Sequence, residues 1–239
     1  MRKILLFALL SISLTAVGQT LKYDSNDTTI VMEYYDGQQW AFRKINGLVV
    51  GLTNSGSRDE YGKCYQVGIY IRNENNRSVV FYPERITSVL KTKKGEEKPL
   101  LVYSYNAYMR KVERSQDWDM ALNSIAVGIN TGMAGHRTAY VSGWSPNTGV
   151  YSGTVRYYDS GAAAAAGIYG SMYLNDLEEK QYKDRRLISK GYLKTTTIHP
   201  GEEILGYINI KRKRGKEMKI VVPINNSIFA YDWILQKYR

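Results

Sequence analysis

The residues best suited to metal or proton chemistry in this sequence are two histidines, one cysteine and a few neighbouring carboxylates. His136 lies in a glycine-rich stretch and His199 stands beside Pro200, so neither has a nucleophile or a second ligand close in sequence. A zinc site needs three or four N, S or O donors, and Cys64 with two separated histidines does not supply them locally. We therefore expect no metal and no cofactor.

The carboxylates give no stronger indication of an enzyme. Asp117 and Asp119 are two residues apart, so on a helix they point to different faces. The adjacent pairs Glu178, Glu179 and Glu202, Glu203 are expected to be exposed. The chain has no Gly-x-Ser-x-Gly motif, although a Ser-His-Asp triad, whose members meet only in space, stays open. A hydrolase is thus the least favoured function class, and the expected protein is not an enzyme.

Aromatic residues point instead to binding. The chain has 21 tyrosines, and tyrosine gives binding surfaces a large contact area at low entropic cost. Five aromatic residues fall within residues 130–160 and are candidate contacts: Tyr140, Trp144, Tyr151, Tyr157 and Tyr158. The alternative interpretation, held equally, is a tyrosine-rich disordered loop.

A basic run is the second candidate binding site. Lys211, Arg212, Lys213 and Arg214 are consecutive, in a chain of formal net charge +11. Such a patch could bind lipopolysaccharide phosphates or nucleic acid, and a basic exported protein could also bind polyanionic glycans or an anionic membrane surface. Alternatively, the run is a hairpin turn whose cations protect the edge of a sheet from pairing with another chain.

The N-terminus has the pattern of a secretory signal peptide over residues 1–18. Arg2 and Lys3 precede an apolar run, and Ala16-Val17-Gly18 forms a small-residue cleavage site before Gln19. The apolar run is shorter than the roughly 20 residues that cross a bilayer. With Cys64 as the single cysteine, an exported chain has no internal disulfide, and Cys64 is expected to be a buried, inert thiol.

Two regions of short, alternating strands flank a different central region. Residues 19–103 and 192–239 contain strand patterns separated by turn signals such as Asn46-Gly47 and Pro200-Gly201, and the segment 63–72 alternates most clearly. Residues 21–27 are expected to be an irregular lead-in. We predict a mainly β protein in which both regions complete one β-sandwich.

Residues 104–191 carry helical periodicity, which predicts an antiparallel α-helical hairpin inserted into the sandwich. Ser104 is the expected N-cap of the first helix, which should end near Gly128 to Gly132, and Asp159 or Ser160 the cap of the second. Residues 130–160 are expected to form a Gly/Tyr-rich loop between them. The predicted apolar stripes are Tyr105, Tyr108, Met109, Val112, Trp118, Leu122, Ile125 and Ile129, and then Ala166, Tyr169, Tyr173, Leu177, Asp184 and Leu187.

The C-terminal run YLKTTTIHPGEEILGYINIKRKRGKEMKIVVPINNSIFAYDW, with NAYMRKVERSQDW at the start of the central region, resembles a group of secreted Bacteroidetes proteins of unknown function. The resemblance covers roughly residues 60 to 235. It implies an immunoglobulin-like β-sandwich around a low-complexity helical insertion, in a Gram-negative bacterium. It implies no catalytic residues.

These patterns predict an exported interaction or assembly protein that makes contact through its helical region and aromatic loop. The alternative is a carbohydrate- or polyanion-binding module of the cell envelope. The expected partners are a protein or an envelope glycan, with self-association and peripheral contact with an anionic membrane as further classes; nucleic acid is disfavoured. The expected location is the periplasm, the outer-membrane surface or the medium.

Overall fold

The computed structural model describes residues 19–23, 29–35, 37–56, 61–145 and 149–237. The predicted signal peptide, residues 1–18, lies outside this part of the chain. The fold is mainly β, and it divides into two compact units. The first contains the described residues up to Val102 and from Thr195 onward, and the second is Tyr103–Lys194.

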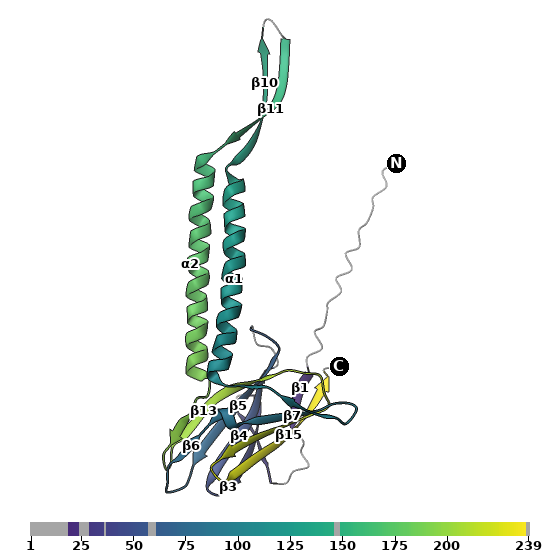
Figure 1. Ribbon diagram of the computed structural model, residues 1–239, viewed down its shortest axis with the longest axis vertical. Helices are drawn as coiled ribbons and strands as arrows, with labels where there is room; N and C mark the ends of the chain where they lie inside the picture. The colour runs from purple at the N-terminus through teal and green to yellow at the C-terminus, as the bar shows by residue number, and fades with distance from the viewer. Residues whose placement is uncertain (1–18, 24–28, 36, 57–60, 146–148, 238–239) are drawn as a thin grey trace. The chain divides into compact units, whose positions relative to one another are not determined.

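Two antiparallel sheets form most of the first unit (Figure 1). Each sheet contains strands that precede the two helices in the sequence and strands that follow them. The six-stranded sheet has the order β2 (Val31–Tyr35), β3 (Gln38–Ile45), β4 (Leu48–Gly56), β5 (Cys64–Asn73), β13 (Glu203–Lys211) and β9 (Val102–Tyr103). The five-stranded sheet has the order β1 (Gln19–Tyr23), β15 (Ser227–Lys237), β14 (Glu217–Ile224), β7 (Thr87–Lys91) and β8 (Glu97–Leu100). A short pair, β12 (Thr196–Ile198) with β6 (Val79–Phe81), and the 3-10 turn η1 (Pro83–Arg85) complete the unit.

Large side chains from both sheets and from the short β12–β6 pair are buried in this unit. Tyr65 and Phe81 precede the helices in sequence, whereas Phe229 and Tyr231 follow them, and all four are fully buried. The hydroxyl of Tyr231 in β15 donates to the Val50 carbonyl of β4 at 2.8 Å, so a bond joins the two sheets inside the core. Cys64 is buried, as predicted.

One strand was not expected. Residues 21–27 are predicted from sequence to be an irregular lead-in, but residues 21–23 belong to β1, which pairs with the end of β15, with Tyr23 opposite Trp233 and Gln19 opposite Lys237. Residues 24–27 lie outside the described part of the chain. The segment is short and has little apolar alternation, so its own sequence gives a weak strand signal. Its partner strand, more than 200 residues later, supplies the hydrogen bonds that order it.

The second unit contains two long helices, α1 (Tyr105–Ala134) and α2 (Ser160–Gly191), which lie side by side (Figure 1). The predicted caps are confirmed. Ser104 Oγ accepts from the Ala107 N–H at 3.3 Å, and the Asp159 carboxylate accepts from the Ala162 N–H at 2.9 Å. Each cap satisfies a first-turn donor that the helix itself leaves unpaired.

The prediction of a loop over residues 130–160 is wrong. Helix α1 continues past Gly128 and Gly132 to Ala134, and two ten-residue strands follow, β10 (His136–Ser145) and β11 (Gly149–Tyr158). They pair from His136 opposite Tyr158 to Ser145 opposite Gly149. Valine, threonine and tyrosine along both strands favour β structure, and the high glycine and serine content of the segment hides that preference in a reading by composition.

Candidate functional site

The contact between α1 and α2 is ordered by polar groups as well as by packing. Helix positions pair in antiparallel order, from Tyr105 with Ser189, whose oxygens are 3.0 Å apart, to the close approach of Val127 and Gly170. A methyl group on Gly170 would overlap Val127 Cγ1. Glycine at this position therefore allows the two helices to approach each other closely.

Two buried glutamines fix the register of this helix pair. Gln116 Nε2 donates to the main-chain carbonyl of Gln181 at 3.2 Å, and Gln181 Nε2 donates to the main-chain carbonyl of Gln116 at 3.3 Å. The Arg185 guanidinium donates to Gln116 Oε1. Sliding one helix by a turn would leave these buried polar groups without partners, which is energetically costly.

The predicted apolar stripe of α1 does not form one face. Tyr108 and Val112 are buried, but Trp118, Leu122, Ile125 and Ile129 are exposed, and Trp118 retains 71% of its accessible surface. The six-residue step from Val112 to Trp118 is about one and two-thirds helical turns, so the two sets lie on different sides of the helix. The six-residue step is visible in the sequence, and it could have predicted that the buried and exposed residues lie on different sides of α1.

The predicted stripe of α2 is wrong in a similar way. Tyr169, Tyr173 and Leu187 are exposed, whereas Ala163 and Gln181, which were not in the stripe, are the buried positions. A small residue and a hydrogen-bonded amide fill the contact with α1. The larger apolar side chains are left outside.

The structure therefore reveals a surface that sequence reasoning did not identify. Nine large apolar side chains of the helix pair are 51% to 72% exposed: Trp118, Leu122, Ile125, Ile129 and Met133 of α1, and Ile168, Tyr169, Met172 and Tyr173 of α2. We call these nine residues the apolar surface. They lie in or beside two segments without any charged residue, 120–134 of α1 and 160–175 of α2.

Part of the apolar surface lies on one side of the helix pair. With 3.6 residues per turn, Leu122, Ile129 and Met133 share a side of α1, and Tyr169 and Tyr173 share the same side of α2. Tyr173 confirms the arrangement, because its hydroxyl donates across to Asn123 Oδ1 at 3.1 Å. The opposite side carries small residues such as Ser124, Gly128 and Ser171.

The five predicted aromatic contacts all lie on the β10–β11 hairpin. Tyr158 is 59% exposed, and its ring centroid is 5.4 Å from that of His136. The register places Tyr140 opposite Thr154, Trp144 opposite Val150, Tyr151 opposite Gly143 and Tyr157 opposite Arg137. The side chains of Tyr140, Trp144, Tyr151 and Tyr157 lie outside the described part of the structure.

The predicted basic run belongs to the other unit and is partly structural. Lys211 ends β13, and Lys213 and Arg214 are exposed beyond it. Arg212 is half-buried with its guanidinium 5.8 Å from the Tyr65 ring centroid, and the Tyr65 hydroxyl donates to the Lys213 carbonyl at 3.1 Å. Burial raises the pKa of Tyr65, and the charge of Arg212 opposes that rise.

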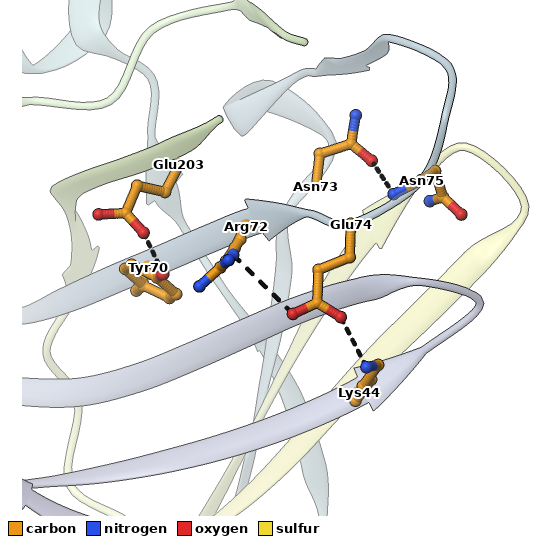
Figure 2. A network of polar contacts seen from close by, with 7 residues as sticks. All are labelled: Lys44, Tyr70, Arg72, Asn73, Glu74, Asn75 and Glu203. Carbon is orange, nitrogen blue, oxygen red and sulfur yellow. Dashed lines mark hydrogen bonds and ion pairs between the residues drawn. The ribbon is translucent and has the colours of Figure 1, made fainter. Parts of the chain in front are cut away.

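A polar network links the ends of β3, β5 and β13 (Figure 2). Glu74 accepts from Lys44 Nζ at 2.6 Å and lies 3.8 Å from Arg72 Nε, and the Lys44 hydrogen bond lowers the pKa of Glu74. Tyr70 donates to Glu203 at 2.5 Å, and burial, followed by this bond, raises the Tyr70 pKa. Most of these groups are exposed, and their contacts join the ends of the three strands.

A serine and a histidine also come together beside this network. Ser78 Oγ lies 2.9 Å from His199 Nδ1. The nearby Glu202 carboxylate accepts from the main-chain N–H of His199 at 2.8 Å, so it fastens the turn and does not orient the imidazole ring. A catalytic triad requires a carboxylate on the ring, and this geometry does not provide one.

Within the residues that the structure describes, no cluster of three or more His, Cys, Asp or Glu side chains could hold a metal ion. Neither α1 nor α2 combines the length and apolar character needed to cross a membrane. Comparison of the chain with protein-family models, curated proteins and solved structures finds no match in any of the three.

Proposed function

We propose that this protein is an exported, non-enzymatic assembly protein. Its immunoglobulin-like β-sandwich is the scaffold, and the helical hairpin inserted into the sandwich is the contact element. The predicted signal peptide supports export. The two-sheet unit supports a scaffold role, because both sheets bury their large side chains within that unit and hold them with bonds such as Tyr231 to Val50.

The apolar surface is the observation that carries the proposal. The five of these side chains that share one side of the helix pair each expose on the order of 100 Å² and together amount to roughly 500 Å². Contiguous apolar patches of about 300–600 Å² are often functional. The helix pair is thus suited to bind a further apolar partner.

A pair of matched double variants tests this function. Leu122→Glu with Tyr169→Glu places one charge on each helix within the apolar surface. Ser124→Glu with Ser171→Glu places the same charges on the opposite side of the same helices. In cells that express each form, chemical cross-linking should yield the same products for wild type and the serine variant, and lose them for the Leu122, Tyr169 variant.

The outcome that contradicts the proposal is an unchanged set of cross-linked products in all three proteins. Export is tested separately by sequencing the N-terminus of the mature protein from fractionated cells, which should begin at Gln19. Retention of residues 1–18 would remove export from the proposal but leave the contact surface in place.

A further inference from the structure

The outer face of the six-stranded sheet carries aromatic side chains across its middle strands. Tyr65, Val67, Ile69 and Ile71 of β5 are fully buried, so the residues between them face away from the core. The strand register extends this outer face across β2, β3, β4, β5 and β13 in two adjacent rows. The first row is Val31, Phe42, Gly51, Tyr70 and Leu205, and the second is Glu33, Trp40, Thr53, Gly68 and Tyr207.

The rings on this outer face contact one another. The ring centroids of Trp40 and Phe42 are 5.9 Å apart, and their planes differ by 18°. Phe42 meets Tyr70 edge to face, also with 5.9 Å between centroids. Gly51 lies between Phe42 and Tyr70 in the row, and a methyl group on it would overlap the Phe42 ring. The glycine therefore lets the Phe42 ring lie close against the sheet and reach Tyr70.

These rings remain open to solvent in part. Trp40, Phe42, Tyr70 and Tyr207 are half-buried. The two ends of the first row are more open, because Val31 is 60% exposed and Leu205 is 68% exposed. We call these six residues the aromatic face.

Groups of both charges border the aromatic face. The register places Lys44, Val49, Arg72 and Glu203 in the row next to Phe42 and Tyr70. Figure 2 shows Glu203 accepting from Tyr70, and Glu74 in contact with both Arg72 and Lys44. The two cations of this border are thus balanced by two carboxylates, and Glu33 adds a third carboxylate in the second row.

This combination of groups suits a neutral sugar chain. The face of an aromatic ring carries partial negative charge, and the C–H groups on the flat side of a pyranose ring carry partial positive charge, so the two stack. Each sugar hydroxyl both donates and accepts a hydrogen bond. The border offers ammonium and guanidinium donors beside carboxylate acceptors, and small-molecule sites typically combine aromatic walls with a few such polar groups.

Other ligand classes fit the aromatic face less well. A polyanion is bound by lysine and arginine side chains that neutralise its charge, whereas Lys44 and Arg72 already contact Glu74. A protein partner would have to bury Glu33 beside Trp40, and charged residues are depleted from the cores of protein interfaces. A sugar hydroxyl can instead donate to this carboxylate.

We propose that the aromatic face is a binding site for a neutral polysaccharide. Sugar rings stack on Trp40, Phe42 and Tyr70, and hydroxyl groups at their edges bond with Arg72 and Glu203. The site belongs to the β unit, so it adds a second binding function and does not depend on the apolar surface of the helix pair.

Isothermal titration of the mature protein with cellohexaose, laminarihexaose, mannohexaose and chitohexaose tests this site. At least one of these neutral sugars should bind. Trp40→Ala should weaken that binding about tenfold, as loss of a stacked ring does for a base on an aromatic side chain, and Trp40→Phe should retain most of it. Tyr34→Ala is the matched control, because Tyr34 is 74% exposed and lies on the opposite face of β2 from Glu33, and it should bind as wild type does.

A second variant covers the case in which Trp40→Ala does not fold. Arg72 is exposed, so Arg72→Ala should keep the wild-type melting temperature and weaken sugar binding several-fold. Binding should also be unchanged when the salt concentration is raised about tenfold, because a neutral ligand releases no counterions. Failure of all four sugars to bind, or binding that neither variant weakens, overturns the proposal. Binding of dextran sulfate alone, lost at high salt, also overturns it.

The same variants separate this inference from the proposed function. Leu122→Glu with Tyr169→Glu should keep sugar binding, and Trp40→Ala should keep the cross-linked products in cells. If Trp40→Ala loses those products and wild type binds no sugar, the aromatic face is a protein contact and the sugar proposal fails. Loss of sugar binding in Trp144→Ala, with Trp40→Ala unaffected, would place the sugar on the β10–β11 hairpin and overturn the site.

Discussion

The two units of this protein use their large side chains in opposite ways. In the β unit, Tyr65, Phe81, Phe229 and Tyr231 are fully buried, and the sheets are closed by strands from both ends of the chain. In the helical unit, the contact between α1 and α2 is made largely by small and polar residues such as Ala163, Gln116 and Gln181, while the apolar surface is exposed. The β unit thus buries its largest side chains within itself, whereas the helical unit leaves most of its large apolar side chains exposed.

The largest test of this contrast compares one aromatic truncation in each unit. Phe229→Ala should destabilise the β unit by about 3–5 kcal/mol, because it removes a fully buried ring. Tyr169→Ala, which is 72% exposed, should change the stability of that unit by less than about 0.5 kcal/mol. Amide hydrogen exchange in β5 and β13 reports on the β unit alone. Equal losses of protection in the Phe229→Ala and Tyr169→Ala variants would contradict the difference in burial between the two units.

The second test concerns the polar contact inside the helix pair. Gln116→Ala should destabilise the pair by about 1–3 kcal/mol, because the main-chain carbonyl of Gln181 loses the Gln116 Nε2 donor and the Arg185 guanidinium loses the Gln116 Oε1 acceptor. Replacing Gln116 and Gln181 together by leucine should recover part of that loss through apolar packing, while Arg185 stays without its Gln116 acceptor. Thermal unfolding followed by helical circular dichroism measures both, and a neutral Gln116→Ala would show that the amides do not hold the register.

The third test uses two glycines as a matched pair. Gly170→Ala should destabilise the helix pair by about 1–3 kcal/mol, because the new methyl overlaps Val127, and Val127→Ala should relieve the loss. Gly128→Ala meets nothing within 4 Å and should stabilise the helix by up to about 1 kcal/mol. The same circular dichroism melt ranks the variants, and a reversed order would contradict the helix contact.

The smallest test is a pH dependence in the β unit. Glu217 accepts from Lys91 Nζ at 3.2 Å and also lies near Lys216; the Lys91 bond lowers its pKa below the ordinary value of 4.5. A carboxyl group whose pKa is lowered by folding contributes stability above 4.5 and loses it as the pH falls through the lowered value. The pairs are partly exposed, so the expected loss is under about 1 kcal/mol. Urea midpoints should shift less with acid in Glu217→Gln, and an identical shift would exclude Glu217 as its source.

Much of the fold follows from local sequence signals. The alternation of Tyr65, Val67, Ile69 and Ile71 predicts β5, and Asn46-Gly47 predicts a hairpin that the structure forms with positive φ at both residues, 49° and 70°. The caps at Ser104 and Asp159 are also local. At each cap, the side-chain oxygen and the N–H group from which it accepts belong to residues only a few positions apart.

The candidate site depends on contacts that such signals do not contain. Trp118 and Val112 both fall in the predicted apolar stripe of α1, but the side of α1 that is covered depends on α2. The buried residues of α2 are Ala163 and Gln181. A hydrophobicity pattern cannot rank alanine and glutamine above tyrosine as contact residues. The hairpin of β10 and β11 was missed because its glycines suggest a loop, although each strand is paired along its whole length.

The pairing of β5 with β13 also has a consequence for how the chain matures. Tyr65 forms a bond with Lys213, 148 residues later, so the central sheet cannot close until synthesis is nearly finished. Until then β5 keeps an open, apolar edge, the kind of segment that aggregates during slow, non-local folding. The order in which the strands are made therefore leaves this edge unpaired for most of the time that the chain is being synthesised.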